Sequence, residues 1–450
     1  MPSVSAANTA SGFPAADLSA RAVKVFLSPI QGLIAAPSLV YVSTLALMLF
    51  HSPDFHFYSL DRIAFAVLVS VVALRICMGC ETLRLSSLVT WPLLGLILLA
   101  LWDALQAHEV ESWSLFAAKW LLPFIMYQVA PLVFNDDRSW RRFETVSLVI
   151  LAYLSVIAIC FLAGAKYLVF PRYILDEGIG YHADRARGPF LQAVANGVSL
   201  NLLGLIALNS FRTRRLRGLW GLLLLAAVPL AIVATKTRAV WLSFAASIVI
   251  LLFVTPSRRV RRACLAGILA TCAGLGVFLA STNRNDSLSE RLEESGPVKF
   301  RFEVYEAGWG MFLGRPLMGW GSVAMTDELD RRISDFQQEH FYFHNTYLEI
   351  LVQYGLLGLG LYIWLVIDLF RLGRGRYRLS EKSFADRQFQ GMWPLLLGVY
   401  LVNGLFVVMN YQFVNGYLFT LAGVLAGQDH RQDRTPAPVT SDRRRQSDFQ

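Results

Sequence analysis

Three ionisable residues stand at the ends of long apolar runs, where such groups are rare. His344 lies where a polar loop gives way to the apolar run at 350–370, Arg238 lies in a short turn between two such runs, and Arg187 lies just before another. Charged groups at the ends of membrane-spanning segments are candidates for function. Guanidinium groups bind anionic oxygens with paired hydrogen bonds, and an imidazole accepts a proton near neutral pH. Together these residues could bind an anion and transfer a proton.

The residues after His344 predict a helix N-terminus. Thr346 and Glu349 have the spacing of a capping box, and Asn345 is an alternative cap. The helix should therefore begin directly after the histidine. Its unpaired backbone N–H groups and the positive end of its dipole would then lie beside the imidazole, a spot that suits an anionic substrate. Because Glu349 fits the cap, we do not interpret it as a second base.

The composition is that of a polytopic membrane protein. Of 450 residues, 55% are hydrophobic and 16% charged, and the mean hydropathy is +0.47, too apolar for a soluble globular protein. The net charge of +9 does not indicate nucleic-acid binding, because the basic residues fall in short blocks between apolar runs. The five cysteines predict no disulfide framework, and the single CxxC at Cys77 and Cys80 is typical of a helix end rather than a metal site.

Runs of about 20 apolar residues can each cross a bilayer as a helix. Two tight pairs among them could each be one re-entrant segment, namely 217–235 with 237–254 and 391–409 with 411–427. We expect an all-α polytopic bundle of about twelve transmembrane spans. The predicted spans lie at about 30–50, 61–79, 86–103, 113–134, 143–165, 190–209, 217–235, 237–254, 262–281, 345–370, 391–409 and 411–427.

Alternate connections carry most of the arginines, and the positive-inside rule assigns these connections to the cytoplasm. Both termini are then cytoplasmic, and the one long connection faces outward. No cleaved signal peptide is expected, since no basic start precedes an apolar core. The chain divides into a disordered tail at 1–25, spans one to nine within 26–281, a periplasmic loop at 282–343, spans ten to twelve within 344–427 and a disordered basic tail at 428–450.

The long loop should contain two short helices. One carries an aromatic stripe that ends before Gly314, and we interpret the stripe as packing on the bundle, with a surface for lipid tails or sugar rings as the alternative. A charge-rich helix at about 326–338 should cover the site as a lid. The stripe consists of Phe302, Tyr305, Trp309 and Phe312.

Two motifs flank the end of this loop. The first runs GRPLMGWG from Gly314 to Gly321, and the second runs HNTYLE from His344 to Glu349 and continues with YGLLG from Tyr354. At this separation they resemble the signature region of the O-antigen ligase and polymerase superfamily. Its members are polytopic membrane glycosyltransferases that move glycans off a polyprenyl diphosphate. The likeness covers roughly residues 180–365.

The resemblance implies roles for Arg187, Arg238 and His344. Its functional positions are an arginine that opens a mid-chain span, an arginine in a Thr/Ser-x-Arg segment and the histidine of the His-Asn motif, which match Arg187, Arg238 and His344. Two arginines could then clamp the leaving diphosphate, and His344 could take the proton of the acceptor hydroxyl. No metal or other cofactor is required if arginines stabilise the departing charge.

Further residues are candidates for substrate contacts. Interfacial arginines often only reach lipid phosphates, but their coincidence with His344 favours a functional interpretation. Arg185 is an alternative to Arg187, because the segment around them lacks the Asn-Pro pair of many members. The other expected substrate-binding residues are Lys236, Asn345, Arg301 and Arg315.

His340 and His344 are four residues apart and could form half of a zinc site if the segment between them were helical. We favour a base at His344, because the predicted helix begins later and no third ligand is fixed by spacing. Gly355, Gly358 and Gly360 are interpreted as small residues for close helix packing.

We therefore expect an inverting, metal-independent glycosyltransferase in the bacterial inner membrane, with its active site facing the periplasm. The resemblance implies an undecaprenyl-diphosphate-linked glycan as donor, and lipid A–core or another glycan as acceptor, which leaves ligase and polymerase both open. Membrane lipids would surround the protein, and nucleic acid is no partner. The alternative is a transporter or flippase of the lipid-linked saccharide, which should carry ionisable groups near the bilayer centre. The runs at 190–209 and 391–427 contain no Asp, Glu, Lys or Arg, which favours the enzyme.

Overall fold

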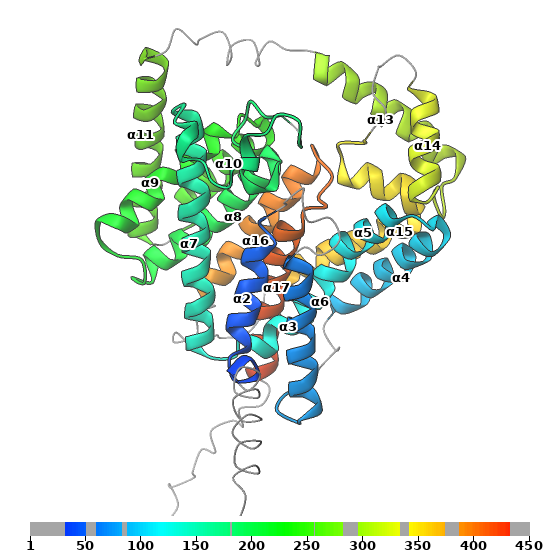
Figure 1. The fold of residues 1–450 in the computed structure, drawn as a ribbon, viewed down its shortest axis with the longest axis horizontal. Coiled ribbons are helices and arrows are strands. Elements are labelled where there is room, and N and C mark those ends of the chain that lie inside the picture. Colours follow the sequence, from blue (N-terminus) through cyan, green and yellow to red (C-terminus); the bar gives the residue numbers. More distant parts are fainter. Residues whose placement is uncertain are drawn as a thin grey trace, which may run out of the picture.

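The structure is a computed structural model, and it describes residues 32–50, 60–82, 88–180, 182–255, 257–281, 296–333, 342–373 and 387–432. Throughout these ranges the regular elements are helices, and none is a strand, so the predicted all-α class is confirmed (Figure 1). The N-terminal tail predicted at 1–25 lies outside the described residues.

Each predicted span falls on a helix or on a continuous helical stretch. The helices are α2 (Pro37–Leu47), α3 (Leu60–Cys77), α4 (Thr90–Ala107), α5 (Val110–Phe116), which runs through the π-helical turn η1 (Ala117–Leu121) into α6 (Leu122–Val133), α7 (Asp137–Leu162), α8 (Ala193–Arg212), α9 (Gly218–Ala234), α10 (Arg238–Val254), α11 (Arg258–Ser281), α15 (Thr346–Leu372), α16 (Arg387–Gly404) and α17 (Gln412–Gln432). The helix α17 continues to Gln432, and the rest of the C-terminal tail predicted at 428–450 lies outside the described residues.

Several of these helices are long and apolar enough to cross a membrane. Among the described residues this holds for five stretches, which are α4, the stretch Ser112–Val133, α7, α8 and α15. Shorter apolar helices occur at α2, α9 and α10. A polytopic membrane protein is therefore supported, and the count of twelve spans stays a prediction. Both tight pairs consist of two separate helices, α9 with α10 and α16 with α17.

The helix α8 lies near the middle of the bundle, where it contacts α7, α9, α10, α11, α16 and α17 (Figure 1). It is the most buried of the candidate spans. Small and amide side chains let neighbouring backbones approach and bind across the core. Ser243 of α10 accepts a hydrogen bond from Asn403 of α16 at 2.9 Å and lies 3.4 Å from the amide nitrogen of Asn201 in α8. These hydrogen bonds connect α8, α10 and α16 within the bundle.

Two helices occupy the described part of the long loop, α13 (Gly296–Gly314) and α14 (Ser322–Arg332). The predicted end of the first helix at Gly314 is confirmed. The second begins four residues earlier than expected, because the Asp103 carboxylate of α4 accepts two hydrogen bonds from the Ser322 backbone N–H, at 2.9 and 3.0 Å. Residues 334–338, the end of the predicted lid, lie outside the described ranges.

The aromatic stripe of α13 packs only in part as predicted. Tyr305 and Phe312 are half-buried against a small apolar cluster, whereas Phe302 is 70% and Trp309 is 53% exposed. The helix turns a different face to the protein, the one that carries Val304, Gly308 and Met311. Half of the stripe therefore remains open to lipid or sugar, the alternative considered above.

The two signature motifs form one interlocked turn. At Gly355 the helix α15 is kinked, with φ 65° and ψ −160°, a conformation open essentially only to glycine. There the carbonyl of Val352 accepts a hydrogen bond from the Trp320 N–H at 3.0 Å, and the Leu356 N–H donates to the carbonyl of Pro316 at 2.8 Å. A Cβ at Gly355 would lie 2.3 Å from the carbonyl oxygen of Leu317. The predicted role in helix packing was wrong here: Gly355 permits a break rather than a helix contact.

Gly355→Ala should destabilise the fold strongly, since it combines a disallowed backbone conformation, costing about 1–3 kcal/mol, with a clash against a backbone oxygen. Gly360→Ala is the matched control, because that position has open space around it and stays helical. Thermal unfolding of the two purified variants in the same detergent measures the difference. Equal unfolding temperatures would contradict the interlocked turn.

Candidate functional site

The segments that carry the predicted cations meet at one end of the bundle. The loop before α8 reaches the end of α9, where the Ala186 N–H donates to the carbonyl of Ala234 at 3.1 Å. The first turns of α8 and α10 are also in close contact, since a Cβ at Gly197 would lie 2.6 Å from the side chain of Val240. Arg187 and Arg238 therefore belong to neighbouring helix ends.

The start of α15 adjoins the same region. The Thr346 hydroxyl donates to the carbonyl of Val407 at 2.8 Å and accepts from the Met409 N–H at 3.0 Å, which fixes the connection between α16 and α17. Across that connection, the ring of Phe413 lies 5.7 Å from that of Phe190, next to the loop of Arg187. His344, which precedes α15, thus belongs to the same layer of helix ends.

Asn345 caps α15, and the capping box predicted on Thr346 was wrong. The Asn345 side-chain oxygen accepts from the N–H groups of Tyr347 at 2.9 Å and Leu348 at 3.1 Å. Thr346 instead binds the connection between α16 and α17, as above, and Glu349 forms an ion pair with Lys119 at 2.7 Å. The alternative cap was therefore the right one. The Asn345 oxygen therefore holds the helix end, and the predicted contact of Asn345 with substrate stays a prediction.

His344 is half-buried and takes a left-handed backbone conformation, φ 49°. Such a conformation is uncommon for a residue with a side chain and tends to occur at functional sites. The ring of Phe300 meets the imidazole edge-on, at 6.3 Å between centroids. Burial, together with the charges of Arg301 and His182, lowers the pKa of His344 from its ordinary value to about 4. The imidazole is therefore neutral at physiological pH and able to accept a proton.

The lowered pKa of His344 predicts the acid limb of activity. Only the neutral imidazole can act as a base, so activity is lost as the pH falls through the folded-state pKa of about 4 instead of through the ordinary 6.5. We expect kcat/KM for the donor, which reports the free enzyme, to stay nearly constant down to about pH 5. Arg301→Gln removes one of the charges that lower the pKa of His344, so this variant should lose activity at a higher pH than the wild type. A limb near 6.5 in both proteins would contradict this electrostatic environment.

Arg238 is the first residue of α10 and is exposed. Its side chain makes no hydrogen bond or ion pair with any described residue. The first turn has no side-chain cap, because the Thr237 hydroxyl donates to the carbonyl of Thr235 at 2.9 Å. A cation at a helix N-terminus is unfavourable by itself, and a bound anion would offset that cost. Lys236, half-buried with φ 48°, lies two residues earlier and could add charge to the same spot.

Arg187 turns inward in this structure, and its predicted part in a diphosphate clamp stays a prediction. It is fully buried, and its guanidinium donates to the carbonyls of Ile174, at 2.9 Å, Ile179 and Asp176. Burial lowers the pKa of Arg187, while the charges of Asp176 and Glu177 act in the opposite direction. These bonds organise the loop that also carries His182. In this structure Arg187 therefore holds the loop at 174–187 in place.

The other predicted substrate-binding arginines differ in their surroundings. Arg301 on α13 makes no hydrogen bond or ion pair within the described ranges, and its charge acts on His344, so it belongs to the site. Arg185 is half-buried, with its Nε 4.0 Å from the carboxylate of Asp184. Arg315 stacks over the ring of Trp320, 4.2 Å from its centroid, and so supports the interlocked turn.

The structure adds residues that the sequence analysis missed. His182, in the loop organised by Arg187, acts electrostatically on His344, and it too has a left-handed backbone, φ 55°. Lys119 lies in the π-helical turn η1 and binds Glu349, which places a buried ion pair one helical turn from Asn345. Lys119 is the single charged residue in the apolar run at 113–134, a signal that could have identified it.

Metal binding has no support among the residues that the structure describes. In those ranges no three His, Cys, Asp or Glu side chains gather as a metal site would require. His340, the partner of His344 in the zinc alternative, lies outside the described residues.

Comparison with known proteins supports the resemblance. Residues 220–363 match the family model of the O-antigen ligases. The matched stretch includes Arg238, Arg301 and His344, together with both motifs of the interlocked turn. No curated protein sequence matches the chain. The match covers less than half of the chain and supports the superfamily predicted from the motifs.

Proposed function

Because residues 220–363 match the O-antigen ligase family model, we propose that the chain is an inverting glycosyltransferase of the inner membrane. Its donor is a glycan linked to undecaprenyl diphosphate, and its acceptor is a hydroxyl of lipid A–core or of another glycan, so that it acts as a ligase or as an O-antigen or exopolysaccharide polymerase. The reaction takes place at the periplasmic ends of α8, α10 and α15. The observation that carries the proposal is a neutral, half-buried His344 next to the uncommitted cation Arg301.

In the proposed reaction the acceptor oxygen attacks the anomeric carbon of the donor. The hydroxyl proton passes to the neutral imidazole of His344 as the new C–O bond forms. The bond from the anomeric carbon to the diphosphate oxygen breaks on the opposite face, which inverts the configuration. The diphosphate leaves with the electron pair, and cationic side chains stabilise its growing charge.

Arg238 and Arg301 are the proposed diphosphate ligands, with Lys236 as a further cation. Both arginines have guanidinium groups without a partner in the described part of the chain, so a bound diphosphate displaces no internal bond. The donor's negative charge also acts back on His344, since a nearby anion favours the protonated imidazole and raises its pKa. Donor binding would thus turn a weak base into a better one.

The proposal needs no metal, and this can be tested directly. Purified protein with lipid-linked donor and acceptor should release undecaprenyl diphosphate at an unchanged rate in excess EDTA, because arginines stabilise the leaving group. Activity that is lost in EDTA and returns with zinc or magnesium would contradict metal independence. Movement of intact donor across a liposome membrane without any release would instead support the flippase alternative.

A further inference from the structure

A second polar site lies at the opposite end of the bundle. A cavity of about 530 Å³ opens between the end of α8 and the first turns of α9 and α11. Among the described residues, four arginines line it, Arg214, Arg217, Arg259 and Arg262, and no carboxylate does. The basic connections assign this end to the cytoplasm. The pocket therefore concentrates positive charge that no carboxylate in its described lining neutralises.

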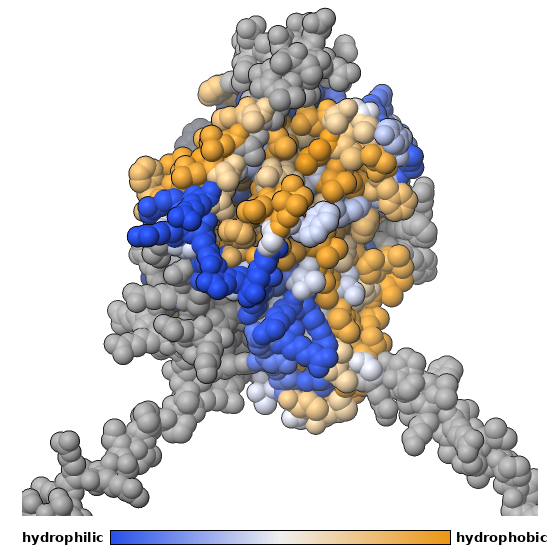
Figure 2. Space-filling view, turned by 90° about the vertical axis from the view of Figure 1, so that its left-hand side faces the viewer, coloured by the Kyte–Doolittle hydropathy of each residue, from blue (hydrophilic) through white to orange (hydrophobic). Residues whose placement is uncertain are grey.

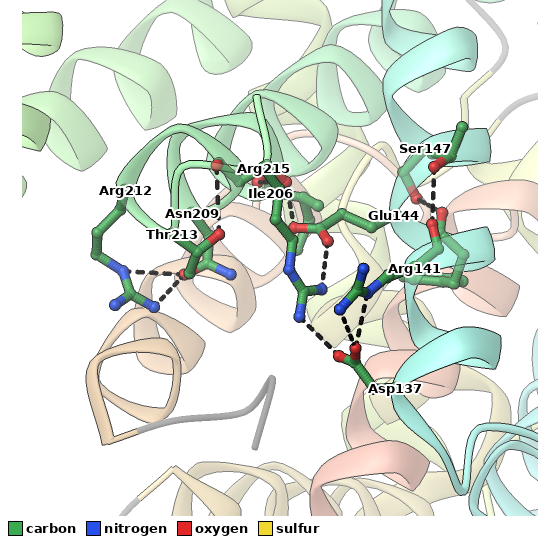
Figure 3. A network of polar contacts seen from close by, with 12 residues as sticks. Asp137, Arg141, Glu144, Ser147, Ile206, Asn209, Arg212, Thr213 and Arg215 are labelled. Carbon is green, nitrogen blue, oxygen red and sulfur yellow. Dashed lines mark hydrogen bonds and ion pairs between the residues drawn. The ribbon is translucent and has the colours of Figure 1, made fainter. Parts of the chain in front are cut away.

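Neighbouring arginines of the same connection are bound by the protein, as Figure 3 shows. Arg215 contacts the carboxylates of Glu144 at 2.6 Å and Asp137 at 2.9 Å, and Arg212 donates to the side-chain oxygen of Asn209 at 2.6 Å. These partners belong to α7 and α8, away from the pocket. The connection 212–217 thus divides its arginines between internal partners and the cavity.

The pocket arginines have no such partners. Arg214, Arg259 and Arg262 are exposed and make no side-chain hydrogen bond or ion pair with the described residues. Within the described part of the chain, Arg217 donates only to the carbonyl of Arg214. Arginine forks bind phosphate oxygens with paired hydrogen bonds. Two helix N-termini, those of α9 and α11, also point their positive ends toward the cavity, which adds to its affinity for an anion.

The walls of the cavity are apolar and continue into a lipid-facing surface. Leu222 and Ala266 line the cavity, and beside it Leu265 and Leu269 are exposed. Trp220 is 82% exposed one turn from the cavity, and exposed tryptophans tend to mark the headgroup level of a membrane. On the face of the molecule that carries α9 and α11, hydrophilic surface lies directly below an apolar expanse (Figure 2).

We propose that this pocket binds a glycerophospholipid with an anionic headgroup, drawn from the cytoplasmic leaflet. The four guanidinium groups hold the phosphate, and the apolar walls of α9 and α11 take the first methylenes of the acyl chains. A basic pocket between helices at this face has the chemistry that anionic headgroups require. The site is separate from the proposed glycosyl-transfer site and does not depend on it.

Two arginine pairs on the same helix provide the test. Arg259→Gln with Arg262→Gln removes two pocket charges, and Arg258→Gln with Arg261→Gln removes two exposed charges that do not line the pocket. The delipidated full-length protein is titrated with phosphatidylglycerol or phosphatidylcholine, and bound lipid is counted by native mass spectrometry. Thermal unfolding of both variants confirms that they are folded. We expect the pocket pair to lower phosphatidylglycerol affinity by about 30-fold, and the control pair by less than about threefold.

Each other outcome overturns the proposal. Equal losses in the two variants would mean that only general surface charge attracts the lipid. No loss in the pocket variant, or equal affinity of the wild-type protein for phosphatidylcholine, would mean that the pocket does not select an anionic headgroup. Competition by glycerol 3-phosphate as strong as that by phosphatidylglycerol would assign the pocket to a soluble phosphate instead of a lipid.

Discussion

His344→Ala should slow glycan transfer by roughly 10²–10⁴-fold, the range that general-base catalysis contributes. The variant loses the group that takes the acceptor proton, while Arg238 and Arg301 stay in place. Donor affinity should therefore remain within a few-fold of the wild type. Transfer rate at saturating donor and equilibrium donor affinity, measured on the same preparation, separate these effects. A lost affinity with an unchanged rate at saturation would make His344 a diphosphate ligand.

Two further variants control for the backbone at His344. His344→Asn keeps a side chain that tolerates the left-handed conformation, so a rate loss equal to that of the alanine variant excludes a collapsed helix start. His108→Ala alters another histidine with positive φ, 54°, which is exposed at the end of α4 and contacts only the carbonyl of Gln106. It should leave the transfer rate unchanged.

Arg238→Lys should weaken donor binding by roughly tenfold or more without lowering thermal stability. The lysine keeps the charge but loses the planar fork, and a hydrogen bond to a charged group contributes about 1.5–3 kcal/mol. Stability should be unaffected because the Arg238 side chain is exposed and has no partner among the described residues. Equilibrium binding of the lipid-linked donor and thermal unfolding are the two measurements.

Arg187→Lys is the matched comparison, with the opposite expectation. It breaks the bonds to three backbone carbonyls that hold the loop, and each buried group left without a partner costs about 1–3 kcal/mol. Thermal stability should fall first, and transfer should fall as a consequence of the disordered site. If Arg187→Lys kept its stability and lost only donor affinity, Arg187 would be a clamp after all, as the superfamily resemblance implied.

The helices could be predicted from the sequence because their signals are local. Each of the twelve predicted apolar runs falls on a helix or a continuous helical stretch, and the cap alternative at Asn345 was correct. The kink at Gly355 was not predictable, since its hydrogen bonds come from residues more than thirty positions away, at 316–321. On α13 the helical period was right but the buried face was not, because that face is set by the partner helices.

For the site, the sequence predicts the types of the residues and their positions at span ends, but not how the loops arrange them. The sequence identifies His344 and Arg238 by their positions at span ends, and the structure places both in one layer of helix ends. The inward turn of Arg187 depends on carbonyls of the loop at 174–179, which leave no mark in the sequence. The proximity of His182 to His344 likewise depends on how that loop folds over the bundle.

The configuration of the bond that the protein forms tests the central claim most directly. Purified wild-type protein is incubated with an undecaprenyl-diphosphate-linked glycan and its acceptor, and the product's anomeric configuration is determined by nuclear magnetic resonance. The proposed reaction predicts a new glycosidic bond of inverted configuration, with an equal amount of undecaprenyl diphosphate released. A retained configuration would contradict the direct attack assisted by His344. Recovery of only intact donor, with no new bond, would contradict the assignment as a glycosyltransferase.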